Sequence, residues 1–178
     1  TIVQRANIFY FMGKFKEAED DATGANELFC SVAGNDCSDG TWAKIVLGGA
    51  LWGQERFEEA LKVLEEAIRV GKLNFGPKHL SVGTIHKYMA RIYIAQKLVG
   101  KAEEEIDFSI SILKTTYPEN SPAMICARIR QAEVRILQNR HEEAIEILGK
   151  ALQHRSKFYG ANHPMTKEVT SLLEKARR

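Results

Sequence analysis

Four alanines recur along this 178-residue chain at a constant spacing, and that spacing constrains the fold more than any other feature. They are Ala18, Ala60, Ala102 and Ala144, each 42 residues from the next without insertion or deletion. Similar segments surround three of them: Gly-Lys-Phe-Lys-Glu-Ala at 13–18, Glu-Arg-Phe-Glu-Glu-Ala at 55–60 and Asn-Arg-His-Glu-Glu-Ala at 139–144. An unbroken period of this length is typical of a protein assembled from stacked copies of one structural unit.

Other positions keep the same register. Small residues recur at Ala6, Gly48, Ala90 and Ala132, and helix breakers recur at Gly34, Gly76, Pro118 and Gly160. Between the breakers, apolar residues are spaced by three and four, as at Leu61, Leu64 and Ile68, which indicates helix and not strand. Each repeat is therefore predicted to be a pair of helices whose small residues allow a close approach.

The pattern predicts a single domain with repeats at about 1–34, 35–76, 77–118 and 119–160. First helices are expected at about 41–53, 81–96 and 121–138, and second helices at about 56–75, 99–116 and 141–158. A C-terminal capping helix is expected at 163–177, because Pro164 suits a first turn and basic residues follow at the negative end of the dipole. The chain begins without Met in what reads as an amphipathic helix, so we expect a fragment of a longer protein.

Composition argues against several classes of partner. The 25 basic and 23 acidic side chains give a formal net charge of +2, so no global field favours nucleic acid or an anionic membrane. No stretch approaches the roughly 20 uninterrupted apolar residues that a membrane helix needs. Three cysteines are an odd number in a chain long enough to form a core, which indicates a reducing compartment. We expect an intracellular, cytoplasmic protein.

No pattern of catalytic or metal-binding residues emerges. His79 and His163 occupy equivalent loops between repeats, where packing or capping is the expected role, and the other three histidines stand singly. Neither Cys-x-x-Cys nor His-Glu-x-x-His is present. Gly48 and Gly49 lie inside a helical pattern without a following Lys-Ser/Thr, so we interpret them as packing glycines and not as a phosphate loop. We expect no cofactor, no metal and no enzymatic activity.

The spacing of small residues, aromatic residues and alanines resembles the tetratricopeptide repeat. The 42-residue period, with inter-repeat loops such as Phe75-Gly76-Pro77-Lys78-His79, resembles the long variant found in kinesin light chains. The resemblance covers essentially the whole chain. It implies an all-α, right-handed α-α superhelix (a tetratricopeptide solenoid) of about four helix-turn-helix repeats plus the capping helix, with the first helices lining a concave face.

One feature of kinesin light chain repeats is missing. Those repeats usually carry an Asn-Asn pair in the first helix, which binds the backbone of cargo peptides. The matching positions here hold Val3-Gln4, Ile45-Val46, Lys87-Tyr88 and Ile129-Arg130. The resemblance therefore does not extend to that mode of cargo recognition.

In each first helix, residues spaced three and four apart form a stripe next to the recurring small residue (Ala6, Gly48, Ala90 or Ala132). This stripe is expected to face the concave groove. The predicted partner-binding residues are Asn7, Tyr10, Trp42, Ile45, Trp52, Lys87, Arg91, Arg130 and Glu133. We hypothesise that a peptide places an apolar anchor between Trp42 and Trp52. Its acidic group would lie near Lys87, Arg91 and Arg130, because cations held together without a counter-charge favour an acidic ligand. Alternatively, Arg130 pairs with Glu133, Arg91 is solvated and the tryptophans belong to the core.

These features predict a non-enzymatic scaffold or adaptor that binds a partner protein or peptide. A second hypothesis is a regulatory or substrate-positioning helical domain of a larger enzyme whose catalytic domain lies outside this segment. A third is self-association through the N-terminal edge.

Overall fold

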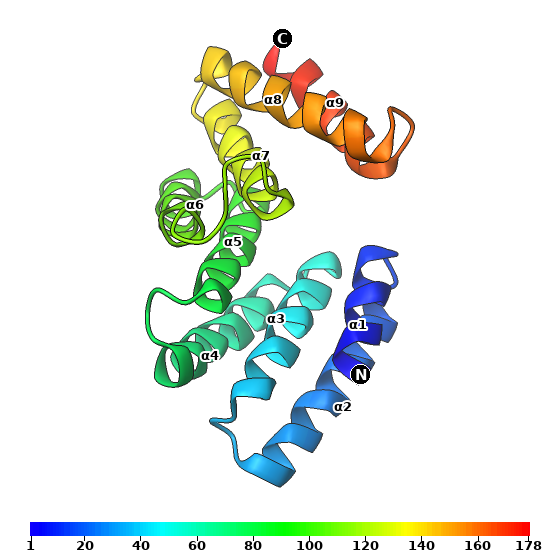
Figure 1. Ribbon diagram of the computed structural model, residues 1–178, viewed down its shortest axis with the longest axis vertical. Helices are drawn as coiled ribbons and strands as arrows, with labels where there is room; N and C mark the ends of the chain where they lie inside the picture. Colours follow the sequence, from blue (N-terminus) through cyan, green and yellow to red (C-terminus); the bar gives the residue numbers. More distant parts are fainter. The chain divides into compact units, whose positions relative to one another are not determined.

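The computed structural model describes residues 1–178 and contains nine α-helices and no strand (Figure 1). The helices are α1 (Ile2–Phe11), α2 (Phe15–Ala33), α3 (Ser38–Gly53), α4 (Phe57–Phe75), α5 (Leu80–Ala95), α6 (Val99–Leu113), α7 (Pro122–Leu137), α8 (His141–Tyr159) and α9 (Pro164–Ala176). They form four consecutive helix-turn-helix repeats followed by one further helix, as the 42-residue period predicted. The all-α fold class is confirmed.

The helices pack as two compact units, Thr1–Ile92 and Tyr93–Arg178, and the division falls within α5. In the first unit, α3 packs on α1, α2 and α4. In the second unit, α7 packs on α6, α8 and α9, and α9 lies along α8 (Figure 1). That all four repeats form a single domain stays a prediction. None of the nine helices has the combination of length and apolar composition that a membrane span requires.

The recurring small residues lie where the helices of each unit meet. The four alanines that define the period are all 0% exposed. A Cβ added to Gly48 would lie 2.6 Å from Leu64 Cδ2, and one added to Gly49 would lie 3.1 Å from the rings of Tyr10 and Tyr88. Because real Cβ contacts at the first distance essentially do not occur, any larger residue at Gly48 would force its neighbours to move. The interpretation of this pair as packing glycines is confirmed.

The turn inside each repeat contains one residue in the left-handed backbone region. These residues are Gly13 (φ 74°), Glu55 (φ 60°), Lys97 (φ 58°) and Asn139 (φ 59°), again 42 positions apart. Glycine adopts this region freely, whereas other residues do so at a cost. Repeat geometry therefore imposes the same backbone conformation on four different side chains.

Glycine ends the second helix in three of the four repeats. Gly34, Gly76 and Gly160 have φ of 81°, 88° and 84° and follow α2, α4 and α8 directly. The third repeat has Pro118 in this column, and the proline ring fixes φ near −65°. The third repeat therefore cannot end its second helix with a residue of positive φ, as the other three repeats do. Its second helix, α6, ends at Leu113, three residues before the predicted 116.

The two loop histidines have the packing and capping roles that we expected. In each loop, the ring Nδ1 accepts a hydrogen bond of 3.2 Å from the backbone N–H two residues on. Each ring also stacks on the aromatic residue that ends the preceding helix: His79 on Phe75 with centroids 4.5 Å apart, and His163 on Tyr159 with centroids 4.9 Å apart. These histidines close the turns between repeats.

Candidate functional site

The first helices of three successive repeats bring four side chains together in the first unit. Tyr10 comes from α1, Trp52 from α3, and Tyr88 and Arg91 from α5. We call these four residues the Arg91 cluster. Tyr10 and Trp52 are 42 residues apart, so two adjacent repeats present them from equivalent positions.

The guanidinium of Arg91 is held among three aromatic rings. Its Cζ lies 3.7 Å from the centroid of the Trp52 ring and 6.0 Å from that of Tyr88. Arg91 also donates a hydrogen bond to the hydroxyl of Tyr10. The rings of Tyr10 and Tyr88 meet edge to face, with centroids 5.9 Å apart. A cation over an aromatic ring contributes about 0.5–2 kcal/mol, more when water is excluded, so the rings fix the orientation of the guanidinium.

Two N–H groups of the Arg91 cluster have no hydrogen-bond acceptor. Arg91 forms no ion pair, and its Nε is buried without a hydrogen-bond partner. The indole Nε1 of Trp52 is likewise buried and unpartnered. A buried unsatisfied donor costs about 1–3 kcal/mol. Two such donors beside an uncompensated cation indicate a place where a negatively charged acceptor from another molecule would be stabilised.

Three other predicted residues of the first unit, Lys87, Asn7 and Trp42, lie outside the Arg91 cluster. Lys87 Nζ lies 5.6 Å from the centroid of Tyr88, so it borders the cluster. Asn7 is half-buried on α1. Trp42 is 44% exposed near the start of α3, and ten residues of helix place it about 15 Å along the axis from Trp52. The two tryptophans therefore do not form one anchor site.

Ile45 was expected on the binding surface, and the structure corrects this. Its side chain is 3% exposed and belongs to the core of the first unit. The stripe we assigned to the groove and the stripe that packs on neighbouring helices are adjacent on α3, where Ala43, Val46 and Ala50 are also buried. An apolar residue at the border of two stripes is drawn into the core, since its burial is favourable.

Arg130 and Glu133 lie in the second unit and form an ion pair of 2.6 Å, which confirms the alternative of a local pair. Arg130 also pairs with Glu168 of α9. Burial opposes its charge, but the carboxylates of Glu133 and Glu168 raise the pKa of Arg130 above its ordinary value. Because this charge is already compensated, Arg130 differs from Arg91. Glu168 lies 38 residues along the chain, so local spacing could not reveal it.

Sequence reasoning missed Tyr88. It was noted only as half of the pair that replaces Asn-Asn, yet it supports both Tyr10 and Arg91. The signal was available, because Tyr88 and Arg91 are three residues apart and therefore share one side of a helix.

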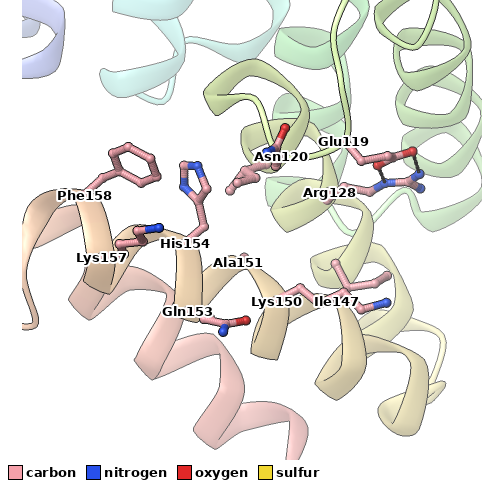
Figure 2. Close-up of a pocket in the computed structure, with 11 residues that line it drawn as sticks. Glu119, Asn120, Arg128, Ile147, Lys150, Ala151, Gln153, His154, Lys157 and Phe158 are labelled. Atoms are coloured by element: carbon pink, nitrogen blue, oxygen red, sulfur yellow. Dashed lines mark hydrogen bonds and ion pairs between the residues drawn. The ribbon is translucent and has the colours of Figure 1, made fainter.

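The second unit contains a surface cavity of about 600 Å³, which the sequence did not predict (Figure 2). It opens between α7, α8 and the loop that precedes α7. Its polar and aromatic lining includes Asn120, Arg128, Lys150, His154, Lys157 and Phe158. Figure 2 shows Phe158, His154 and Asn120 near one another, with Arg128 held by Glu119 farther along the cavity. No group of three or more His, Cys, Asp or Glu residues in the chain could hold a metal ion, and the three cysteines are free.

Comparisons with known proteins agree with this architecture. Residues 41–105 match the family model of the tetratricopeptide repeat. No curated protein matches the sequence. Among solved structures, the chain is similar to a putative kinesin light chain with nearly identical TPR-like repeats from Podosopora anserina. That similarity has 18% identity and a TM-score of 0.69, and covers 99% of this chain and 92% of the other.

Two further structures have similar folds. BtubC (BKLC) from P. vanneervenii has 16% identity and a TM-score of 0.70, over 97% of this chain and 72% of that one. The apo form of RapI has 14% identity and a TM-score of 0.69, over 97% of this chain and 67% of that one. The chain thus has an all-α repeat fold of the solenoid class. More specifically, residues 41–105 match the tetratricopeptide repeat, and the chain as a whole has the fold of the TPR-like repeats of kinesin light chains.

Proposed function

We propose that this chain is a non-enzymatic protein-interaction scaffold or adaptor, and that the Arg91 cluster receives an acidic segment of a partner protein. Repeats of this kind are commonly protein-interaction scaffolds, which supports the class of function. The observation that carries the site is the pair of unsatisfied donors, Arg91 Nε–H and Trp52 Nε1–H, beside a cation without an ion pair.

A carboxylate at this place would accept hydrogen bonds from both donors and compensate the charge of Arg91. Hydrogen bonds in which the donor or the acceptor is ionised are roughly twice as strong as neutral ones. The faces of Trp52 and Tyr88 would cover the apolar part of the same side chain. The hydroxyl of Tyr10 and the Trp52 ring already hold the guanidinium, so little conformational entropy is lost on binding.

An extended partner segment would reach further predicted residues. Lys87 borders the cluster, with its Nζ 5.6 Å from the centroid of the Tyr88 ring, so we propose that the segment passes beside it. Trp42 is exposed about 15 Å away along α3, which an extended peptide spans in four or five residues. We propose that Trp42 contacts a different residue of the segment from the one that Trp52 contacts, and that Asn7 flanks the site.

The experiment is selection of a random peptide library displayed on phage, followed by fluorescence polarisation with the selected peptides. Arg91→Glu should weaken binding by about tenfold or more, because it removes the cation and repels a carboxylate. Lys62→Glu makes the same change of charge on the exposed face of α4 and should leave affinity unchanged. Equal affinity for wild type and Arg91→Glu would rule out this site.

A further inference from the structure

The fourth repeat departs from the second and third repeats at two positions of α8 that line the cavity. His154 stands 42 and 84 residues after Ile112 and Val70, which are 2% and 0% exposed in the core. Phe158 stands in the column of two exposed polar residues, Asn74 and Thr116. The fourth repeat thus has a polar ring where the second and third repeats have buried aliphatic side chains, and an aromatic ring, 65% exposed, where they are polar. The first repeat has exposed apolar residues at both positions, Leu28 and Val32. A local departure of this kind from a repeated packing rule is typical of a functional position.

His154 lines the cavity and carries an unsatisfied polar atom. Its Nδ1 is buried and has no hydrogen-bond partner. The rings of His154 and Phe158 are in contact, with centroids 4.4 Å apart, and both lie toward Asn120 (Figure 2). The cavity volume of about 600 Å³ is within the usual range for ligand sites. In the tautomer that carries its proton on Nδ1, a group that accepts a hydrogen bond from this atom would therefore be stabilised here.

The charges of the lining favour a negative ligand. Arg128 and Glu119 neutralise each other through a hydrogen bond of 2.8 Å. Lys150 pairs with Glu146, but the two side chains are 76% and 71% exposed, and such a pair contributes little. Lys157 forms no ion pair. The lining therefore leaves positive charge along α8, where 150 and 157 are about 10 Å apart by helical rise.

We propose that this cavity is a second binding site, for a short acidic peptide segment that also carries a bulky apolar side chain. The apolar side chain packs on Phe158 and Ile147, which line the same cavity. A carboxylate of the segment accepts a hydrogen bond from His154 Nδ1–H and pairs with Lys157. Two exposed lysines and an exposed ring spread over about 12 Å of helix suit an extended segment of about four residues. This site lies in the second unit and does not depend on the Arg91 cluster.

The test uses the Arg91→Glu chain, from which the site proposed above has been removed. A random peptide library on phage is selected against this chain, and fluorescein-labelled selected peptides are measured by polarisation. We expect selected peptides rich in Asp or Glu with a Phe, Leu or Trp, and about tenfold or greater loss of affinity in Lys150→Glu/Lys157→Glu. Absence of selected peptides, or peptides that bind the lysine variant equally well, would overturn the proposal.

A second variant separates a ligand-binding histidine from a structural one. His154→Ile restores the residue type of Ile112, so we expect the chain to fold with a raised melting temperature and to lose about tenfold in peptide affinity. A lowered melting temperature would show that His154 stabilises the fold and would contradict the assignment. Unchanged peptide affinity of His154→Ile would also contradict the assignment. Amide chemical shifts of the ¹⁵N-labelled Arg91→Glu chain should move in α8 on binding, and movement confined to the first unit would also overturn it.

Discussion

Single residues at the turns show how the repeat geometry overrides local preference. Glu55, Lys97 and Asn139 all adopt left-handed φ, in the column where the first repeat has glycine. For residues with a Cβ this conformation costs roughly 1 kcal/mol, so each turn retains some strain. The strain is compensated by the packing of the two helices that the turn connects.

Glu55→Gly should therefore stabilise the protein by about 0.5–1 kcal/mol, because glycine adopts φ near 60° without steric cost. Glu58→Gly, three residues on in the first turn of α4, is the matched control and should destabilise by about 0.5–1 kcal/mol, because it lowers helix propensity and removes a carboxylate from the positive end of the helix dipole. Urea unfolding measures both. If the two glycine variants change stability in the same direction, the turn does not carry the strain inferred from its backbone.

At Gly53, the last residue of α3, we expect a substitution away from glycine to destabilise the protein, because neighbouring atoms pack closely against it. A Cβ on Gly53 would lie 2.4 Å from the ring of Phe15, too close for any real contact. Gly53→Ala should cost about 1–3 kcal/mol. Phe15→Ala in the same chain removes the clash, so the double variant should be less destabilised than the sum of the two single variants. Additive thermal or urea data would contradict a direct contact between these residues.

Helix ends are set by the chemistry of one residue in each repeat. Gly76 has φ 88° and ψ 162°, a region that is essentially restricted to glycine. Gly76→Ala should destabilise by about 1–3 kcal/mol. Gly24 lies inside α2, and a Cβ added to it would have no atom within 4 Å, so Gly24→Ala should instead stabilise by about 0.5–1 kcal/mol. Opposite signs in urea unfolding are the expected result, and destabilisation by both would refute this reading of the helix end.

Neighbouring repeats are joined by a glutamate that receives hydrogen bonds from the end of the next first helix. Gln54 donates to Glu19 at 2.9 Å, and Gln138 donates to Glu103 at 2.7 Å, with 35 residues between partners in both cases. Arg135, almost buried, also binds Glu103. Hydrogen bonds from Arg135 and Gln138 hold the pKa of Glu103 below its ordinary value of 4.5.

A carboxyl group with a lowered pKa in the folded state stabilises the fold when it is ionised. The contribution of Glu103 should be complete above about pH 5 and should fall as the pH drops below 4.5. Glu103→Gln should therefore cost about 1 kcal/mol at pH 7, and the difference from wild type should shrink toward pH 3. Melting temperatures of both proteins across this range test the point, and a difference that grows on acidification would contradict it.

At the scale of the whole molecule, periodicity explains why the fold could be predicted. The same local pattern occurs four times, so the boundaries of α4, α5 and α7 agree with expectation to within one residue. The end of α6 could not be predicted from the average repeat, because Pro118 changes the backbone at one copy. Loops and caps repeat with the helices, which is why the roles of His79 and His163 were also predictable.

The site was less predictable because it depends on contacts between repeats. Sequence spacing placed Trp52 and Arg91 on neighbouring first helices, but not the stacking of one on the other. It could not distinguish Ile45, which is buried, from exposed neighbours on the same stripe, nor identify Glu168 as the partner of Arg130. The cavity beside His154 became visible only when α7, α8 and the loop before α7 were placed together (Figure 2).

The emission of Trp52 tests the proposed partner site most directly. In Trp42→Phe, Trp52 is the only tryptophan of the chain, and its ring lies against Arg91. Titration with a peptide selected on the wild-type chain should change this emission saturably, with the same Kd that polarisation gives, and Arg91→Glu should abolish the change. Binding seen by polarisation while the emission of Trp52 stays constant would place the partner elsewhere and contradict the account.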